Sequence, residues 1–348
     1  MKAVVWEDKD IVNVRDIPDI QPADQIIVKV SYAGICGSDL MIKSGKHPSA
    51  VPPLVLGHEF AGRIHHIPMQ YRDRFESGQR VVVNPLISCR TCKQCLNGHE
   101  HVCENLRLLG VGHGPGAFTE YTSVPQPERI HPLPETVSDK EAALIEPLAV
   151  AVHAVDRANL SDEDTVLVLG AGTIGLCIAL VVRAYGVKQI WLTEIDDSKI
   201  KRAERLGFHI IHSGTHDVVE EITKLTNNAM VDVTFDAAGV PQTATQLVPL
   251  TATKGTVVVV AIHKKPASVL LRDLVYKELT VLGSWIYEDH HFPKAIQLIS
   301  QGKVDVKPLI THVLSIQEAV AAFDIAQNGK DVCKVLLTPT GADVSHQL

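Results

Sequence analysis

Hydrophobic and polar positions follow two different patterns along the chain. From Asp164 onward, short runs of Val, Leu and Ile alternate with longer stretches of helical character. Strands and helices that alternate in this way form a parallel sheet with helices on both faces, so this part predicts an α/β domain. The predicted strands are 166–169, 189–193, 231–235 and 256–262, and the predicted helices are 174–185, 198–206 and 243–250.

Residues 1 to about 124 contain instead short β-rich runs separated by glycine and proline, such as Ile26–Val30 and Arg80–Val83. This pattern predicts a mostly β domain with long loops. A capping box at Ser138–Glu141 opens an Ala/Leu/Val-rich stretch through Ala154, which predicts a helix. The last part of the chain predicts helices at 292–300 and 315–327, the second opened by a capping box at Ser315 and Glu318, and a strand at 335–337.

The bulk composition fits a folded enzyme with two domains. A chain of 348 residues exceeds the size at which a single hydrophobic core keeps growing. Hydrophobic residues make up 45% of the chain and charged residues 21%, which excludes an intrinsically disordered protein. The formal net charge of -7 and the lack of a basic stripe argue against nucleic acid or an anionic membrane as a partner.

Two stretches bear on location. The N-terminal residues reach Glu7 before any apolar run of signal-peptide length, so we expect a cytoplasmic protein. Residues 166–182 carry no charge and are about as long as the shortest membrane-spanning helices. Gly170, Gly172 and Gly175 divide this run into a strand and an apolar helix, which predicts burial inside a folded domain.

A dinucleotide-binding motif follows the first strand of the α/β part. Gly170, Gly172 and Gly175, with Thr173 and Ile174 between them, form a Gly-x-Gly-x-x-Gly turn that leads into a helix. The glycines permit a tight turn and close approach of a pyrophosphate, and the helix N-terminus attracts the phosphates.

An acidic residue at the end of the next strand indicates which dinucleotide binds. Glu194 is placed to accept a hydrogen bond from a ribose 2′-hydroxyl and to repel a 2′-phosphate, so NAD is favoured over NADP. Lys199, Lys201 and Arg202 lie close downstream, where one could reach a phosphate or all could line a solvated helix face. We include Lys199 among the candidate cofactor residues.

Four of the seven cysteines are closely spaced. Cys89, Cys92, Cys95 and Cys103 follow the pattern C-x-x-C-x-x-C and a fourth cysteine, which favours four thiolates around one structural zinc ion in a lobe of about residues 86–106. A pair of disulfides is the alternative, which a reducing compartment disfavours. Ligation of an iron–sulfur cluster is a further alternative.

A second set of metal-type ligands consists of Cys36, His58 and Glu59. A thiolate, an imidazole and a carboxylate form a three-ligand zinc site whose fourth position is open to a substrate oxygen. A buried cysteine and a hydrogen-bonded core histidine are the alternative. Glu146 supports a metal nearby, because a carboxylate in the apolar run Leu144–Leu148 is costly to bury unless it is paired or near a metal. The alternative is that Glu146 lies on a surface helix face.

These motifs, in this order and over essentially the whole chain, resemble the zinc-dependent medium-chain alcohol dehydrogenases. Gly34–Asp39, Leu56–Phe60 and Ile145–Pro147 look like the sorbitol dehydrogenase branch, which includes polyol-phosphate, butanediol and threonine dehydrogenases. The resemblance implies that Cys36, His58 and Glu59 hold a catalytic zinc, and that Glu146 is a further ligand or binds its water. Ser38 would accept the proton of the alcohol, and hydride would pass to NAD.

The resemblance also implies an architecture and an assembly. A GroES-like catalytic domain would span 1–150, a Rossmann-type NAD domain 151–285, and a return to the catalytic domain 286–348. Relatives are commonly homodimers or homotetramers in which edge strands of the nucleotide domains pair, and Lys277–Gly283 is the candidate strand.

Two departures from the family pattern bear on the substrate. Met41 stands where many relatives have a histidine that passes the proton to solvent, so that relay must run differently. Gly283–Tyr287 contains Trp285 where sorbitol dehydrogenases have an Arg-Tyr pair, which is more like galactitol-phosphate dehydrogenases. Candidate substrate residues are Trp285 and the cationic or imidazole side chains of Lys43, Lys46, His47, His113, His290 and His291.

The sequence therefore predicts an NAD-dependent zinc dehydrogenase that acts on a small-molecule polyol or polyol phosphate. A small-diol or threonine dehydrogenase is the alternative within enzymes. A non-catalytic or zinc-free nucleotide-binding protein of the same fold is the alternative from a different class.

Overall fold

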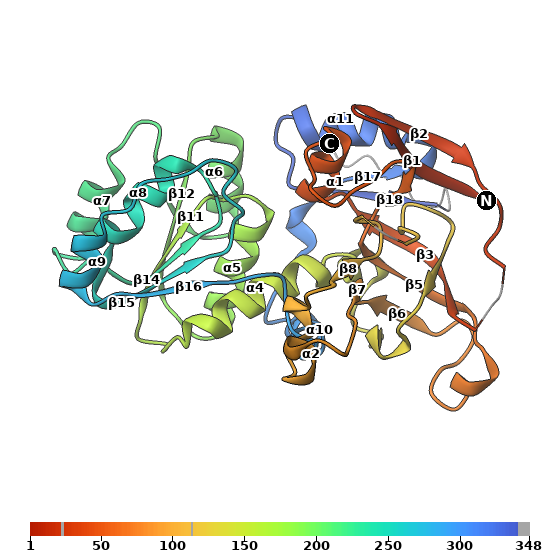
Figure 1. Ribbon diagram of the computed structural model, residues 1–348. Coiled ribbons are helices and arrows are strands. Elements are labelled where there is room, and N and C mark those ends of the chain that lie inside the picture. Colours follow the sequence, from red (N-terminus) through yellow and green to blue (C-terminus); the bar gives the residue numbers. More distant parts are fainter. Residues whose placement is uncertain (22–23, 113, 340–348) are drawn as a thin grey trace. The chain divides into compact units, whose positions relative to one another are not determined.

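The computed structural model describes residues 1–21, 24–112 and 114–339, and its chain divides into two compact units (Figure 1). The first unit contains residues up to Glu146, the segment Glu288–Gly302 and the chain from Val306 onward. The second unit contains Pro147–Tyr287 and Lys303–Asp305. The α/β class predicted from the hydrophobic pattern is confirmed by the sheets described below.

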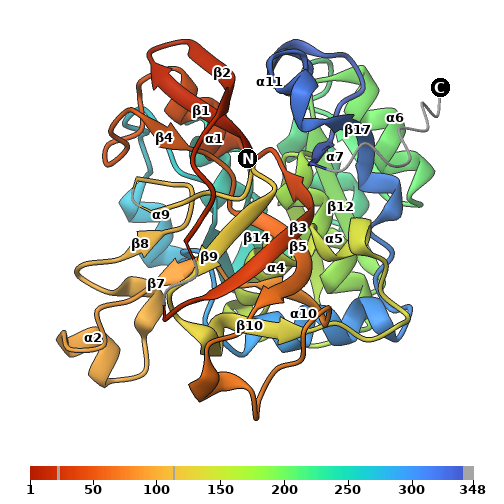
Figure 2. The same cartoon turned by 90° about the vertical axis from the view of Figure 1, so that its right-hand side faces the viewer.

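The first unit is built mainly from strands. Its largest sheet has the order β10-β6-β5-β3-β18-β17, with β9 pairing beside β3, and a smaller sheet has the order β2-β1-β4 (Figure 2). The strands are β1 Lys2–Asp8, β2 Ile11–Asp16, β3 Ile26–Gly34, β4 Leu54–Val55, β5 Glu59–His66, β6 Arg80–Val83, β7 Leu86–Ile87, β8 Arg107–Leu108, β9 Tyr121–Val124, β10 Ile130–Pro132, β17 Ile310–Ser315 and β18 Lys334–Thr338.

Short helices connect these strands. They are α1 Gly37–Lys43, α2 Lys93–Leu96, α3 Asp139–Ala142, α10 His291–Ser300 and α11 Ala319–Asn328, with 3-10 turns at Met69–Tyr71, Glu100–Val102, Pro127–Arg129, Lys307–Leu309 and Ile316–Glu318. The strand β18 pairs with β3 in antiparallel register, Leu336 opposite Gly34. The last described strand thus lies against the segment that leads into Cys36.

The second unit contains one parallel sheet of order β13-β12-β11-β14-β15-β16. Helices α7, α8 and α9 lie on one side of it and α5 on the other (Figure 1). The strands are β11 Thr165–Leu169, β12 Gln189–Glu194, β13 His209–His212, β14 Val231–Asp236, β15 Thr251–Val259 and β16 Thr280–Gly283. The helices are α4 Ile145–Ala158, which begins at the unit boundary, α5 Thr173–Ala184, α6 Asp197–Arg205, α7 Val218–Leu225, α8 Pro241–Leu250 and α9 Leu271–Lys277.

Most predicted elements are present within one or two residues, but one predicted helix and one predicted strand differ from the structure. The stretch after Ser138 forms two helices: the capping box opens the short α3, and a second helix, α4, begins at Ile145. The predicted strand 256–262 corresponds to β15, which begins earlier, at Thr251, ends at Val259 and passes through Lys254 at φ 67°. No helix of the described residues is long and apolar enough to cross a membrane.

Candidate active site and metal centres

The predicted ligands Cys36, His58 and Glu59 lie together in the first unit. Cys36 caps the N-terminus of α1, and His58 and Glu59 stand at the start of β5. One donor atom of each residue lies within 4.8 Å of the others, and His58 and Glu59 are only 4% and 1% exposed. This donor set fits a zinc ion with one position open to a further ligand. We call these three residues the ligand trio.

Asp39 orients the trio from within α1. Its Oδ2 accepts a hydrogen bond from the Cys36 backbone N–H at 2.9 Å, and its Oδ1 lies 3.6 Å from His58 Nδ1. Neither Oδ1 nor Nδ1 has a hydrogen-bond partner among the described residues. Burial opposes charge on His58, but Asp39 and Cys36 together hold the pKa of this imidazole well above its usual value. A carboxylate behind Nδ1 leaves Nε2 to face the site.

Ser38, the predicted proton acceptor, lies beside the trio. Its Oγ is 3.3 Å from His58 Nε2. Because Ser38 belongs to the first turn of α1, the same short helix positions the thiol of its cap, the hydroxyl and the Asp39 carboxylate. The structure therefore brings Ser38 to the ring nitrogen that faces the site.

Lys334 binds Glu59 and was not identified from the sequence. Its Nζ donates to both carboxylate oxygens of Glu59, at 2.8 and 2.6 Å, and to the Ile35 carbonyl at 3.2 Å. Burial alone would lower the pKa of Lys334, but the negative charges of Glu59 and Cys36 raise it. The contact also needs Gly34, because a Cβ there would lie 2.3 Å from Glu59 Oε2.

Glu146 lies in the first turn of α4 and is 5% exposed, so it does not occupy a surface helix face. It is not among the donor atoms that lie within 4.8 Å of one another in the trio. Its part in the metal site stays a prediction.

The four cysteines of the lobe converge. Sγ atoms of Cys89 and Cys95 lie 3.9 Å apart, those of Cys92 and Cys95 3.5 Å, and those of Cys92 and Cys103 4.0 Å. A tetrahedron with Zn–S bonds of about 2.3 Å has edges of about 3.8 Å, whereas a disulfide bond is about 2.05 Å long. All seven cysteines are free of disulfides. The spacing fits one tetrahedral zinc ion.

Hydrogen bonds and burial shift the pKa values of two lobe thiols in opposite directions. Backbone and hydroxyl donation from Thr91, with further bonds from Cys92 and Cys103, lowers the pKa of Cys89 to about 5. Burial and hydrogen bonds within the cluster raise the pKa of Cys95 to about 12. Backbone N–H groups of Cys89 and Asn105 both donate to Cys103 Sγ at 3.3 Å. Such donors stabilise thiolates, the form that binds zinc.

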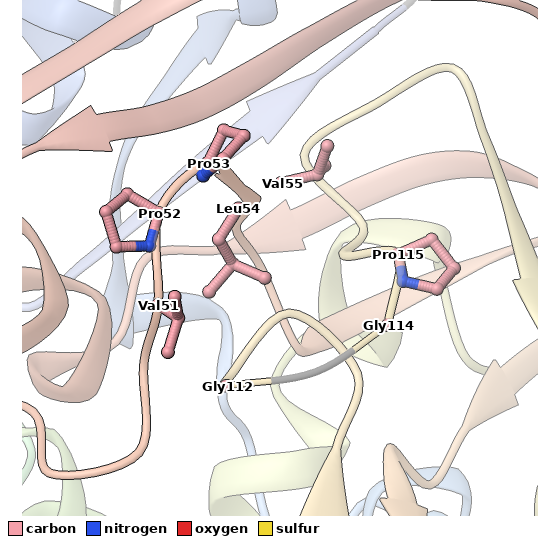
Figure 3. A pocket seen from close by; sticks show the side chains of 8 residues that line it. All are labelled: Val51, Pro52, Pro53, Leu54, Val55, Gly112, Gly114 and Pro115. Carbon is pink, nitrogen blue, oxygen red and sulfur yellow. The ribbon is translucent and has the colours of Figure 1, made fainter.

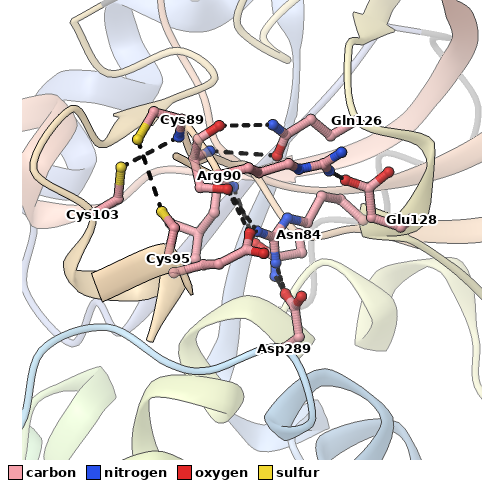
Figure 4. Close-up of polar contacts among 12 residues, drawn as sticks. Asn84, Cys89, Arg90, Cys95, Cys103, Gln126, Glu128 and Asp289 are labelled. Atoms are coloured by element: carbon pink, nitrogen blue, oxygen red, sulfur yellow. Dashed lines mark hydrogen bonds and ion pairs between the residues drawn. The ribbon is translucent and has the colours of Figure 1, made fainter. Parts of the chain in front are cut away.

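A buried arginine, Arg129, pairs with a glutamate of the lobe and with Asp289, which Figure 4 shows together with the lobe residues Cys89, Cys95 and Cys103. Arg129 is 1% exposed and forms ion pairs with Glu100 of the lobe and with Asp289. Asp289 also accepts a hydrogen bond from Asn84 Nδ2 at 2.9 Å, and Glu100 accepts one from the Ser88 hydroxyl. The lobe is thus joined to the segment that precedes α10.

A cavity of about 530 Å³ lies on the loop that leads to the trio (Figure 3). Its described lining residues carry no charged side chain; they are Val51, Pro52, Pro53, Leu54, Val55, Gly112, Gly114 and Pro115. The cavity is the size of a small-molecule site, but these residues offer no cation to a phosphate.

The candidate substrate residues belong to different segments of the chain and to both units. Lys43 donates to Gln327 Oε1 at 3.2 Å, and Lys46 is exposed. His47 accepts from the Ser49 N–H at 3.4 Å, and burial and the nearby His58 lower the pKa of its ring. Trp285 lies in the second unit, where its side chain is 44% exposed. His113 lies outside the described residues.

The remaining two histidines of that set stand at the start of α10. His290 is its N-cap, and its Nδ1 lies 3.6 Å from Glu288 Oε2. His291 is buried, and its Nδ1 accepts a hydrogen bond from the Glu288 N–H at 2.9 Å.

The glycine motif of the second unit joins β11 to α5 as predicted, with Gly172 as the helix N-cap. A Cβ on Gly175 would lie 1.9 Å from the Gly170 carbonyl oxygen, so only glycine lets the helix approach the turn this closely. Thr173 and Ile174 form the first helical positions, where backbone N–H groups point out of the helix end. This arrangement fits a pyrophosphate.

Glu194 ends β12 beside that turn. Its Oε2 accepts from the Ala171 N–H at 3.1 Å and its Oε1 from the Ile195 N–H at 2.8 Å. The carboxylate therefore stands at the carboxyl edge of the sheet, where a ribose hydroxyl is expected. The backbone N–H of Lys199 donates to Asp196, the N-cap of α6. The role of the Lys199 side chain in binding the cofactor stays a prediction.

A further acid–histidine pair at this edge was missed from the sequence. Asp236 ends β14, is fully buried and lies 2.7 Å from His263 Nε2. Its other oxygen accepts from the Ala238 and Gly239 N–H groups at 3.1 Å. The sequence offered one signal for this pair, because Asp236 directly follows the predicted strand 231–235. Its partner His263 lies 27 residues further along the chain, so the pair is not visible as a local motif.

Comparison with known proteins agrees with this geometry. Residues 22–135 match the model of the alcohol dehydrogenase GroES-like domain, and residues 173–301 match that of the zinc-binding dehydrogenases. The chain is 34% identical to 2-dehydro-3-deoxy-L-galactonate 5-dehydrogenase of Pseudoalteromonas atlantica, over 86% of this chain and 87% of the relative. It is 31% identical to sorbitol dehydrogenase of Bacillus subtilis, over 97% of each, and 32% identical to the (R,R)-butanediol dehydrogenase of that organism, over 97% and 100%.

Solved structures extend the comparison. The NADH complex of RspB from Escherichia coli superposes with a TM-score of 0.88 at 32% identity, covering 97% of this chain and 99% of that one. An NADP-bound zinc-binding dehydrogenase from Sinorhizobium meliloti superposes with a TM-score of 0.90 at 34% identity, covering 97% of this chain and 99% of that one. Galactitol-1-phosphate dehydrogenase from Escherichia coli superposes with a TM-score of 0.89 at 30% identity, covering 97% of this chain and 100% of that one.

A parallel nucleotide-binding sheet, together with a β unit that gathers two sets of zinc-type ligands, defines a metal-dependent alcohol dehydrogenase. The chain belongs to the zinc-dependent medium-chain alcohol dehydrogenases, in the branch that contains the sorbitol and other polyol dehydrogenases.

Proposed function

We propose that the protein is an NAD-dependent zinc dehydrogenase that oxidises a secondary alcohol of a polyol or polyol phosphate to the ketone. The observation that carries this proposal is the convergence of Cys36, His58 and Glu59 beside Ser38, in a chain whose second unit presents a glycine turn and Glu194.

The residues of the first unit divide the work of alcohol oxidation. A zinc ion, when bound by the trio, supplies a Lewis acid that favours the alkoxide form of an alcohol. Ser38 Oγ would accept the alcohol proton while its own hydroxyl proton passes on to solvent, and this Oγ lies 3.3 Å from His58 Nε2, the ring nitrogen that faces the site. Asp39 fixes the His58 ring through Nδ1, and Lys334 holds Glu59 through both oxygens. Hydride transfer to the nicotinamide is the chemistry of the cofactor.

Two zinc ions per subunit are proposed, one in the trio and one in the four-cysteine lobe. The lobe binds its ion with four protein ligands and leaves no open position, so its role is structural. Glu146 is proposed as a further ligand of the trio's zinc or as the group that binds its water.

NAD is the proposed cofactor because Glu194 places a carboxylate where a 2′-phosphate of NADP would be repelled. The proposed pyrophosphate-binding residues are Gly170, Gly172, Thr173, Ile174 and Gly175, and Lys199 on α6 is a further candidate cofactor residue. RspB, whose solved structure holds NADH, supports this assignment; the Sinorhizobium meliloti protein, which holds NADP, makes the measurement of both cofactors necessary.

A polyol substrate is supported by the sorbitol and galactitol-1-phosphate dehydrogenases among the similar proteins. Trp285, Lys43, His47 and His113 are the proposed substrate residues. A small diol is a second candidate, favoured by the similarity to butanediol dehydrogenase.

Steady-state rates with NAD and with NADP test these proposals. The panel contains sorbitol, galactitol, their phosphates and 2,3-butanediol. We expect kcat/KM with NAD to exceed that with NADP, and a polyol or its phosphate to exceed butanediol. Strong butanediol turnover without polyol turnover would replace the first candidate by the second.

A homodimer or homotetramer in the cytoplasm is proposed as well. The strand β16 forms an edge of the parallel sheet, and Val281 on it is 49% exposed. Leu270, Leu271, Val275 and Tyr276, at the start of α9 and on it, are 64–75% exposed. Such a patch beside an open edge fits pairing with a second copy. Seven free cysteines fit a reducing compartment.

A further inference from the structure

A third group of metal-type donor atoms lies in the first unit, apart from the trio and the cysteines. His99 and His101 flank Glu100 in the lobe, and Glu288 lies in the segment before α10. One donor atom of each lies within 4.8 Å of the others. We propose that His99, His101 and Glu288 bind a divalent transition-metal ion of the zinc class, at a site distinct from the two required by the proposed function.

The spacing of the donor atoms fits a metal ion better than hydrogen bonds. His99 Nδ1 lies 3.6 Å from Glu288 Oε1, and His101 Nδ1 lies 3.9 Å from the same oxygen. Both distances are too long for a hydrogen bond. Metal–ligand bonds of about 2.1 Å in a tetrahedron place neighbouring donor atoms about 3.4 Å apart. One carboxylate oxygen facing two imidazole nitrogens at this separation leaves room for an ion between them.

The chemistry of the donors selects the class of ion. Two imidazoles and a carboxylate suit zinc and its neighbours in the first transition row, and disfavour magnesium and calcium, which prefer oxygen ligands. The site is reached from solvent, because the side chain of His99 is 54% exposed and that of Glu288 is 28% exposed, whereas His101 is buried. Three protein ligands leave a position for water, so the site is weaker than the four-cysteine lobe.

The ligands are held in place by Arg129. This buried side chain pairs with Glu100, which stands between the two histidines, and with Asp289, which follows Glu288. Both chain segments are therefore fixed through residues adjacent to the ligands. The histidines also lie between Cys95 and Cys103, so zinc in the lobe would stiffen the loop that carries them. Preorganised ligands are what a metal site requires. An ion at this site would link the lobe to the segment before α10 through its bonds to both.

Glu288 has a further neighbour that keeps its carboxylate oriented. His290 Nδ1 lies 3.6 Å from Oε2, the oxygen that does not face His99 and His101. The backbone N–H of Glu288 donates to the buried His291. These contacts leave Oε1 directed at the two imidazoles of the lobe.

Calorimetric titration of the holoprotein with ZnCl2, after gel filtration to remove loosely held metal, tests the site. We expect one binding event per subunit in the wild type. His99→Ala, at an exposed position, and Glu288→Gln, which keeps the side-chain shape, should each weaken it at least tenfold, since loss even of a ligand's partner costs about 10–100-fold in affinity. Cys36→Ser should leave the event unchanged, and so should His209→Ala, which removes an exposed histidine of the second unit.

Two results would overturn the proposal. One is a titration in which His99→Ala and Glu288→Gln bind the added zinc as the wild type does, or in which the wild type binds none. The other is an event lost in Cys36→Ser, because the titration would then report the trio of the proposed dehydrogenase site. Failure of the catalytic proposal, by contrast, appears in the turnover assays and leaves this titration unaffected.

Discussion

At the residue scale, Asp39 and Lys334 hold the proposed ligands of the trio in place: Asp39 contacts Cys36 and His58, and Lys334 binds Glu59. Cys36, His58 and Glu59 stand in short motifs, and the spacing of the lobe cysteines is local, so both sets are visible in the chain. Asp39 and Lys334 act through contacts that depend on the fold. Lys334 lies 275 residues from Glu59, and only the register of β18 against β3 brings the two together.

Replacement of Asp39 tests its role behind His58. Asp39→Asn keeps the size of the side chain and removes the charge opposite Nδ1, so zinc in the trio should be held about 10–100-fold more weakly. Competition with a chromophoric chelator measures this affinity. Asp73→Asn, at an exposed position, is the matched control. Equal affinities in the two variants would show that Asp39 does not support the metal.

Replacement of Lys334 tests the buried ion pair. Lys334→Met leaves the Glu59 carboxylate, whose side chain is 2% exposed, without its cation. Removing one partner of a buried pair costs about 3–5 kcal/mol, so the free energy of unfolding should fall by that order in urea titrations. Lys43→Met removes a lysine whose ammonium group makes an exposed contact and should change stability little. A similar small change in both variants would contradict the account.

At the element scale, long amphipathic or apolar runs were predictable and short polar elements were not. The helix α5 and the strand β11 follow from an apolar run divided by glycines. The strand β13 has four residues, two of them histidine, and the helix α1 has seven, so neither has a clear periodic signal. Yet α1 carries Ser38 and Asp39 and is capped by Cys36. The element most important for the site was therefore among the hardest to predict.

The edge strand β16 gives a prediction at this scale. Val281→Lys places a charge on an exposed position of that strand, 49% exposed, and should prevent strand pairing between copies. Sedimentation velocity should show a smaller species than the wild type. Val320→Lys, at a position 57% exposed on α11, should leave the assembly intact. An unchanged sedimentation coefficient for Val281→Lys would place the interface elsewhere.

At the scale of the whole molecule, each unit contributes one half of the proposed reaction. The first unit gathers the trio with Ser38, and the second presents the glycine turn with Glu194. The order of motifs along the chain made this division predictable, and family membership agrees with it. The substrate was not predictable to the same degree, because its candidate residues are scattered single side chains with no shared motif.

The most direct test of the account is metal and activity analysis of Cys36→Ser. After dialysis against a mild chelator to remove weakly held ions, we predict two zinc ions per subunit in the wild type and one in the variant. The variant should still bind NADH, followed by fluorescence, but should lose NAD reduction with the best polyol of the panel. Two zinc ions and wild-type turnover in Cys36→Ser would show that the trio is not the catalytic centre.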